Sequence, residues 1–322
     1  MNRPRLPRRS FQPAVVILLA GLLCLSGAGS PASSAEGGGG VRAYEFARLS
    51  AEPVGRSVSG AHVAAVGGPE ALAWNPAGLA SPASAGAMIS HASWLAGTAW
   101  QYGAVSVDLP GKGGTVGLSA GMLRVGSLQG YAADGSATGE FTPFAAVGTL
   151  GYARSITDRW QLGVCAVVFF EGDGADSPEP AAAGGGGLQY MHPLSFGRLA
   201  VGASVLHLGA EQTAGEESFA LPATYRAGVS LETTRGIDLH AATETATGDE
   251  PSFSFGLAWR PTGGLAALGG FGYDGAADES PVTPSFGLAL DVGPTQVAYS
   301  YQPTVIEEGS HQVALYVPFA HR

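Results

Sequence analysis

Large apolar residues alternate with small or polar ones at every second position over many stretches of this chain. In residues 251–260 one face carries Phe253, Phe255, Leu257 and Trp259. Successive side chains of a β-strand point to opposite faces, so this period of two predicts strands rather than helices. An apolar face opposite a small or polar face is the pattern of a transmembrane β-barrel, with lipid outside and a polar lumen inside.

Composition supports a membrane barrel. Charged residues make up only 13% of the chain, about half of the usual quarter, and 50 of the 322 residues are glycine. After the N-terminal segment the sequence contains no run long enough and apolar enough for a transmembrane helix. Strands are the remaining way to cross a bilayer, and an all-β chain of this length is commonly one domain.

Counting the alternating segments gives a fourteen-stranded antiparallel barrel over residues 86–322. The predicted strands are 86–93, 98–109, 114–126, 142–155, 160–171, 184–192, 198–209, 222–233, 236–246, 251–260, 264–274, 283–293, 295–303 and 311–319.

Short and long connections alternate between these strands. Outer-membrane barrels have short periplasmic turns and longer external loops, and an even number of strands returns both ends to the periplasm. Charge follows the same division, because acids such as Asp134, Glu140 and Glu250 fall in the long connections, whereas Lys112 and Arg159 fall in short ones. Loop length and charge therefore predict the same topology.

The first 35 residues have the features of an export signal. Four arginines precede an apolar core from Ala14 to Leu25, and a small-residue stretch ends at Ala35, where we expect cleavage. The formal net charge of the chain is −10, and removing these arginines makes it more negative by four. Such an acidic protein is not expected to bind nucleic acid.

Residues 60–80 end in Trp74-Asn75-Pro76-Ala77-Gly78-Leu79. Pro76 biases Asn75 away from the helical region, and Gly78 is able to adopt positive φ, so a turn is expected here. By itself this stretch also fits a glycine-rich turn that closes a short helical segment.

Together with Tyr44 to Phe46 and Ser90 to Gly97, this segment resembles the N-terminal signature of the PorV/PorQ family of FadL-like outer-membrane barrels. The resemblance covers roughly residues 43–110. It implies a fourteen-stranded barrel preceded by a small N-terminal hatch, here residues 36–85. It also implies candidate hatch or ligand-binding residues, which are Tyr44, Phe46, Trp74, Asn75, Pro76 and Gly78. The alternative for the three aromatic residues is that they pin the plug to the wall.

Charged residues on the predicted inward face form a second set of candidates: Arg124, Arg226, Glu232, Asp238, His240 and Glu244. In barrels such groups usually form a structural network that holds a lumen or plug, and more rarely line a substrate path.

Catalytic and metal-binding motifs are weak. Gly117 to Gly121 has the spacing of a serine-hydrolase elbow, but Ser119 falls in the middle of a predicted strand instead of at a strand-to-helix turn. The acidic stretch from Glu171 to Asp176 lacks the full calcium-loop spacing, and the histidines are scattered. We therefore expect a non-enzymatic protein without a cofactor or resident metal.

Two functions remain open. The PorV/PorQ resemblance implies a Gram-negative outer-membrane protein that handles secreted proteins or secretion components in type IX secretion. The FadL-like architecture implies passive transport of a hydrophobic ligand, such as a fatty-acid-like molecule, with membrane lipid as the surrounding partner. A purely structural barrel is a third possibility.

Overall fold

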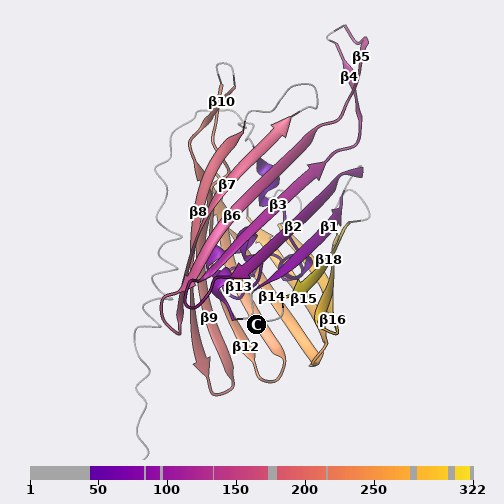
Figure 1. Ribbon diagram of the computed structural model, residues 1–322. Coiled ribbons are helices and arrows are strands. Elements are labelled where there is room, and N and C mark those ends of the chain that lie inside the picture. The colour runs from indigo at the N-terminus through magenta and orange to yellow at the C-terminus, as the bar shows by residue number, and fades with distance from the viewer. Residues whose placement is uncertain are drawn as a thin grey trace, which may run out of the picture. The chain divides into compact units, whose positions relative to one another are not determined.

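A closed antiparallel β-barrel surrounds a short N-terminal segment, residues 44–82, which we call the hatch (Figure 1). The structure is a computed structural model, and it describes residues 44–82, 85–94, 97–132, 134–172, 180–214, 217–275, 281–303 and 309–319. The expected export signal at residues 1–35 and its cleavage site lie outside the described residues.

The predicted count of fourteen barrel strands is confirmed. The barrel strands are β1 (Gly86–Ser93), β2 (Ala99–Asp108), β3 (Thr115–Arg124), β6 (Phe144–Ser155), β7 (Trp160–Gly172), β8 (Ala181–Leu194), β9 (Gly197–Gly209), β12 (Thr224–Thr233), β13 (Ile237–Ala246), β14 (Ser252–Thr262), β15 (Leu265–Asp274), β16 (Val282–Val292), β17 (Thr295–Gln302) and β18 (Ser310–Pro318). Their bounds differ from the predicted ones by at most three residues. β18 pairs with β1 from Gly86 opposite Pro318 to Ser93 opposite His311, which closes the barrel and leaves no sheet edge.

The alternation in the sequence places large apolar side chains on the outside of the wall. In β14, for example, Phe255 is 47% exposed, and its ring stacks on that of Phe271 from β15 at a centroid distance of 5.2 Å. The intervening inward positions carry small residues such as Ser254 and Gly256. An apolar outer surface of this kind is stable in lipid rather than in water.

The two ends of the barrel differ. Tight turns connect the strands at the end where β1 begins and β18 finishes, and we call it the turn end; longer connections lie at the opposite loop end (Figure 1). Two of those connections contain hairpins that the sequence did not predict, β4 (Leu128–Tyr131) with β5 (Ala137–Phe141) and β10 (Gln212–Ala214) with β11 (Glu217–Phe219). In β4 and β5 nearly every residue is exposed, so neither face imposes an apolar alternation.

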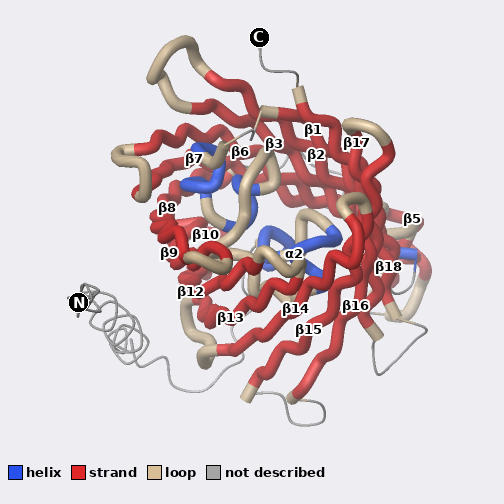
Figure 2. Tube along the Cα trace, turned by 90° about the horizontal axis from the view of Figure 1, so that it is seen from below, coloured by secondary structure: helices blue, strands red, loops and turns tan. Residues whose placement is uncertain are grey.

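The hatch contains four short helices inside the ring of strands (Figure 2): η1 (Glu45–Arg48), α2 (Pro53–Ser57), α3 (Ala71–Trp74) and η2 (Pro76–Ala80). Two of them begin in the same way, with a capping side chain followed by proline. Glu52 accepts the N–H groups of Val54 and Gly55 ahead of α2, and Asn75 accepts that of Ala77 at the start of η2. None of the described helices is long and apolar enough to span a membrane.

Closure of the barrel predicts heat-modifiable migration on a denaturing gel. Each strand is hydrogen-bonded on both sides, so the folded barrel is expected to survive detergent at room temperature and to run differently before and after boiling. Within the described part of the chain no disulfide contributes to the difference, because Cys165 is free and buried there. Identical migration of the boiled and unboiled samples would contradict a closed barrel.

Candidate functional site

The wall accommodates the hatch because many inward wall positions are glycine. A β-carbon added at any of these positions would lie within 3 Å of a hatch atom: Gly117, Gly151, Gly163, Gly187, Gly202, Gly228, Gly256, Gly270 and Gly287. They come from β3, β6, β7, β8, β9, β12, β14, β15 and β16. The high glycine content is thus partly explained by close approach of two backbones, for which glycine is suited.

Asn75 and Pro76 lie against two of these glycines, Gly163 and Gly187. Asn75 is fully buried, and its Nδ2 donates to the carbonyl oxygens of Val63 in the hatch at 2.9 Å and Leu188 in β8 at 3.1 Å. Its Oδ1 accepts the N–H of Ala77 at 3.1 Å. The Asn-Pro pair therefore starts η2 and fastens it to the wall at the same time.

Gly78 has a role that the sequence interpretation missed. A turn with positive φ was expected there, but Gly78 lies inside η2 and does not have a left-handed conformation. A β-carbon on Gly78 would collide with the carbonyl oxygen of Val66. Small size, rather than conformational freedom, is what this position requires.

Trp74 contacts one side chain in the hatch and one in the wall. Its Nε1 donates to Glu52 Oε1 at 3.1 Å, and the guanidinium of Arg226 from β12 lies 5.2 Å from its ring centroid. Arg226 also donates to the carbonyl oxygen of Ala73 at 3.1 Å, and Ser204 from β9 donates to that of Trp74 at 2.7 Å. These contacts fasten α3 to the β9–β12 side of the wall.

Tyr44 and Phe46 begin the hatch inside an apolar group near the loop end. We define the aromatic cluster as Tyr44, Phe46, Trp100, Tyr102 and Phe169, all of which are buried. The Tyr44 ring stacks on Phe169 at 5.3 Å, and Phe46 lies 6.3 Å from both Phe169 and Trp100. The chain's own aromatic residues thus fill the space between β2 and β7.

A bulge in β9 adds one more side chain beside the aromatic cluster. The register between β8 and β9 shifts between Gly184 and Gly186, and His207 adopts a left-handed conformation with φ of 62°. As a result both Leu206 and His207 are buried, and the His207 ring lies 5.4 Å from Phe169. A run of glycines in β8 was the available sequence signal for this irregularity.

Most of the charged lumen candidates form ion pairs. Arg226 Nε lies 2.6 Å from Glu244, and Glu244 also contacts Arg48 of the hatch at 3.4 Å. Arg48 makes further pairs with Asp249 at 2.9 Å and Glu45 at 3.2 Å. This network joins the start of the hatch to the loop end of β12 and β13.

The remaining inward candidates lie toward the turn end. Glu232 pairs with Arg198 at 2.7 Å, and Asp238, which is almost fully buried, pairs with Arg260. His240 Nδ1 lies 2.8 Å from the hydroxyl of Ser230. The turn-end group is therefore separate from the network around Arg48.

Arg124 differs from the expectation. Arg124 lies two residues after Met122, so it shares the outer face of β3, and it is exposed at the loop end. Because inward and outward positions alternate strictly in this strand, Arg124 cannot share the face of Thr115 and Gly117. It is a surface residue and does not belong to the lumen set.

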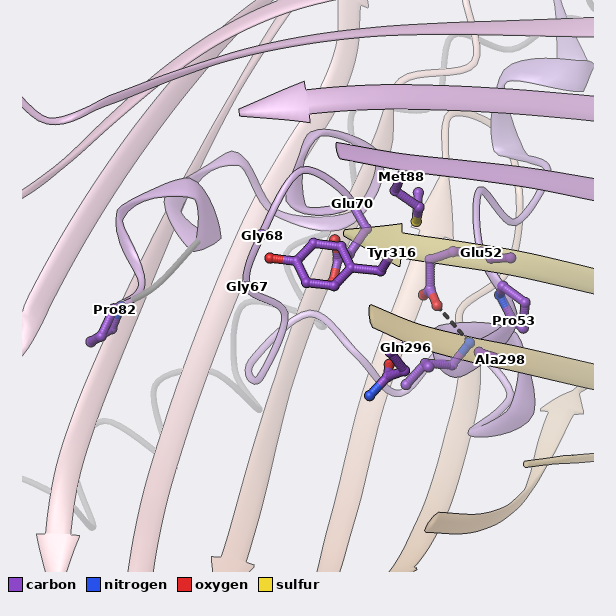
Figure 3. A pocket seen from close by; sticks show the side chains of 12 residues that line it. Glu52, Pro53, Gly67, Gly68, Glu70, Pro82, Met88, Gln296, Ala298 and Tyr316 are labelled. Atoms are coloured by element: carbon purple, nitrogen blue, oxygen red, sulfur yellow. Dashed lines mark hydrogen bonds between the residues drawn. The ribbon is translucent and has the colours of Figure 1, made fainter. Parts of the chain in front are cut away.

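A cavity of about 210 Å³, which we call cavity 1, lies between the hatch and the strands β17, β18 and β1 (Figure 3). Glu52 and Glu70 line it from the hatch, and Met88, Gln296 and Tyr316 line it from the wall. Burial raises the pKa of Glu52 to about 7 and that of Glu70 to about 8, and for Glu70 the nearby Glu52 adds to the effect. Glu70 Oε2 is buried without a hydrogen-bond partner.

A second cavity, of about 240 Å³, lies on the other side of the hatch against β13 to β16. Polar side chains form part of its lining, among them Arg226, Glu244, Ser252 and Ser254. Because Arg226 and Glu244 pair with each other, this cavity belongs to the ion-pair network that holds the hatch.

Several residues of the site were not found from the sequence. Glu52, Glu70 and Arg56 lie in an irregular stretch without a period, and their burial depends on a wall that is distant in sequence. Over the described ranges, no group of three histidine, cysteine or acidic side chains is arranged to hold a metal ion. Ser119 lies inward in the middle of β3, in extended backbone instead of a strand-to-helix elbow.

Comparisons with known proteins show what the fold resembles. No protein-family model matches the sequence, and no curated protein matches it. Among solved structures, the Pseudomonas putida toluene transporter TodX is similar with a TM-score of 0.56 and 12% identity, covering 83% of this chain and 97% of TodX. The CymD monoaromatic hydrocarbon channel gives 0.54 and 14%, covering 84% of this chain and 98% of CymD.

The chain is therefore similar in fold to TodX and CymD. This similarity supports the barrel fold that the sequence predicts. Membership of the PorV/PorQ family, with its implied role in type IX secretion, receives no support from the comparisons, because the similar structures are named as hydrocarbon transporters and channels. The chain has the fold of those channels.

Proposed function

We propose that this chain is a non-enzymatic outer-membrane channel through which hydrophobic small molecules cross passively. The observation that carries the proposal is a buried aromatic cluster that continues into a cavity beside the hatch. Met88 and Ala314 belong to the same hydrophobic core as the aromatic cluster, Tyr316 packs against that core, and all three also line cavity 1. An apolar molecule that passes beside the hatch would therefore contact these three side chains, in a cavity that Glu52 and Glu70 also line.

This path lies along one side of the hatch. From β3 to β16 the hatch rests on inward glycines, whereas Met88, Ala298 and Ala314 stand beside it on β1, β17 and β18. Where the hatch lies against glycine backbone, a path cannot open unless a strand moves. Side chains such as Met88, in contrast, change rotamer easily. Passage is therefore proposed between the hatch and the β17–β18–β1 side of the wall.

The outer face supports a position in the membrane. Large apolar residues are exposed on that face of most strands, among them Leu118, Leu150, Phe255 and Leu288. With the turn end toward the periplasm and the loop end outside, the acidic long connections face the cell exterior. The names of TodX and CymD, a toluene transporter and a monoaromatic hydrocarbon channel, favour hydrophobic cargo for a barrel of this fold.

Narrowing the path is the direct test. Met88→Trp is expected to fill cavity 1 and to lower toluene permeation several-fold in liposomes that contain the purified protein. Ser254→Trp, which occupies the cavity on the opposite side of the hatch, is the matched control and should leave permeation unchanged. Equal permeation in protein-free and wild-type liposomes would refute the proposal, and copurification of a secreted protein would instead favour the type IX role.

A further inference from the structure

Arg56, in α2 of the hatch, is a buried cation without a counter-charge among the described residues. It is 7% exposed, and none of the described carboxylates lies within ion-pair distance of it. Its Nε and Nη2 donate to Gln302 Oε1 at 3.2 and 3.1 Å, and Nη2 also bonds to the hydroxyl of Ser310. Both partners are neutral, and Nη1 is buried without a hydrogen-bond partner in the described part of the chain.

The other arginines of the described lumen are neutralised. Arg48 contacts Glu45, Glu244 and Asp249, and Arg226 contacts Glu244. At the turn end, the arginines at 198 and 260 pair with Glu232 and Asp238. A buried charge is costly unless a partner compensates it, so the exception at Arg56 calls for a reason beyond packing.

A second unpartnered donor lies beside Arg56. The Arg56 guanidinium carbon is 5.6 Å from the ring centroid of Trp94, and the Trp94 Nε1 is buried without a hydrogen-bond partner. Trp94, at the loop end of β1, packs against the hydrophobic core that contains the aromatic cluster. Two unsatisfied N–H donors therefore lie close together at the edge of an aromatic surface.

We propose that Arg56 and Trp94 bind the carboxylate of an aromatic monocarboxylate whose ring packs against the aromatic cluster. This assignment rests on the proposed channel function and names one class of its cargo. A guanidinium matches a carboxylate in geometry and charge, and the indole N–H adds a further donor. The rings of Phe46, Trp100 and Phe169 belong to the hydrophobic core against which Trp94 packs, and they favour an aromatic body over an alkyl chain.

The electrostatic setting is consistent with an anionic head group. Burial lowers the pKa of Arg56 to about 10, so the side chain remains charged at neutral pH. Three described acids near the same end have partners of their own, because Glu244 and Asp249 contact Arg48, and Glu171 accepts the backbone N–H of Tyr44 at 3.2 Å. A cationic ligand would be repelled at this position, and a neutral one would leave the charge uncompensated.

Binding of three probes to the full-length protein in detergent tests the assignment: 3-phenylpropanoate, propylbenzene and octanoate. Wild-type protein is expected to bind 3-phenylpropanoate about 10-fold or more tighter than propylbenzene, because charged hydrogen bonds are worth more than neutral ones. Arg56→Gln should abolish that difference and leave propylbenzene binding within about twofold of wild type. Arg124→Gln removes an equal charge from the outer face and is the matched control, expected to bind like wild type.

The outcomes separate this assignment from the channel function. If neither aromatic probe binds, the proposed function itself fails. If propylbenzene binds but 3-phenylpropanoate binds no tighter, or if Arg56→Gln keeps the preference, the carboxylate site is refuted and the channel function stands. Octanoate that binds as tightly as 3-phenylpropanoate would overturn the aromatic part of the proposal. A second variant, Trp94→Phe, keeps the ring and removes the N–H, and it should weaken the carboxylate alone.

Discussion

Replacing Gly187 with valine is expected to unseat the hatch and to convert the plugged barrel into a conducting pore. The added β-carbon would overlap the side chain of Asn75, which itself bonds to Val63, Leu188 and Ala77. Overpacking costs about 1–3 kcal/mol, and each lost hydrogen bond about 1 kcal/mol. The total is several kcal/mol at one anchor, whereas the outer barrel surface is untouched. Planar-bilayer conductance should rise from near zero to that of an open pore.

Gly103→Val is the control for this variant. Gly103 lies in β2 on the outer face, where an added β-carbon has no contact closer than 3.8 Å. The Gly103→Val variant carries the same chemical change and should therefore remain non-conducting. Deletion of residues 44–82 should reproduce the conductance of Gly187→Val without any change to the wall. An unchanged conductance in both the deletion and Gly187→Val would mean that the hatch does not block the lumen.

Raising the pH from 5 to 9 is expected to loosen the hatch. Glu70 and Glu52 have pKa values of about 8 and 7 in the folded protein, above the ordinary value near 4.3, because burial disfavours their charged forms. A carboxyl group with a raised pKa stabilises the folded state fully below its unfolded pKa and loses that contribution as pH rises through the folded one. The loss falls between about pH 4.5 and 8 and is on the order of a few kcal/mol.

The measurement is the urea concentration at which conductance appears in planar bilayers at pH 5, 7 and 9. Wild-type protein should open at progressively lower urea as the pH rises. Glu70→Gln is uncharged at every pH and should remove most of the dependence, whereas Glu140→Gln, an exposed change in the β4–β5 hairpin, should retain it. An opening threshold that is constant across this pH range, or one that rises with pH, would contradict the burial of these carboxyls.

The barrel was predictable from the sequence because its wall has two chemically different faces. In a wall strand such as β14, outward residues such as Phe255 are large and apolar, whereas inward residues such as Gly256 are small. The two environments therefore produce an alternation at every second residue of the sequence. The β4–β5 hairpin was missed because both of its faces meet solvent. Arg124 was assigned to the wrong face although its spacing from Met122 already indicated the outer one.

The site was much less predictable. Tyr44, Phe46, Trp74 and Asn75 were identified through a family resemblance, and the structure places all four in the interior. Their partners come from strands more than a hundred residues away in many cases, as with Asn75 and Leu188. No local pattern marks Arg56 or Glu70 as buried, because their environment exists only after the barrel closes around the hatch.

The inward glycines also divide the wall into positions with different tolerance to mutation. Outward residues such as Phe255 and Leu288 meet a fluid environment, so most apolar residues of any shape serve there. A glycine such as Gly163 or Gly187 permits no other side chain while the hatch remains in place. Random mutagenesis with selection for a closed pore should therefore leave the outer face highly variable and the inward glycines that contact the hatch almost invariant. Sequence drift concentrated on the outer face would let barrels with 12–14% identity retain one fold.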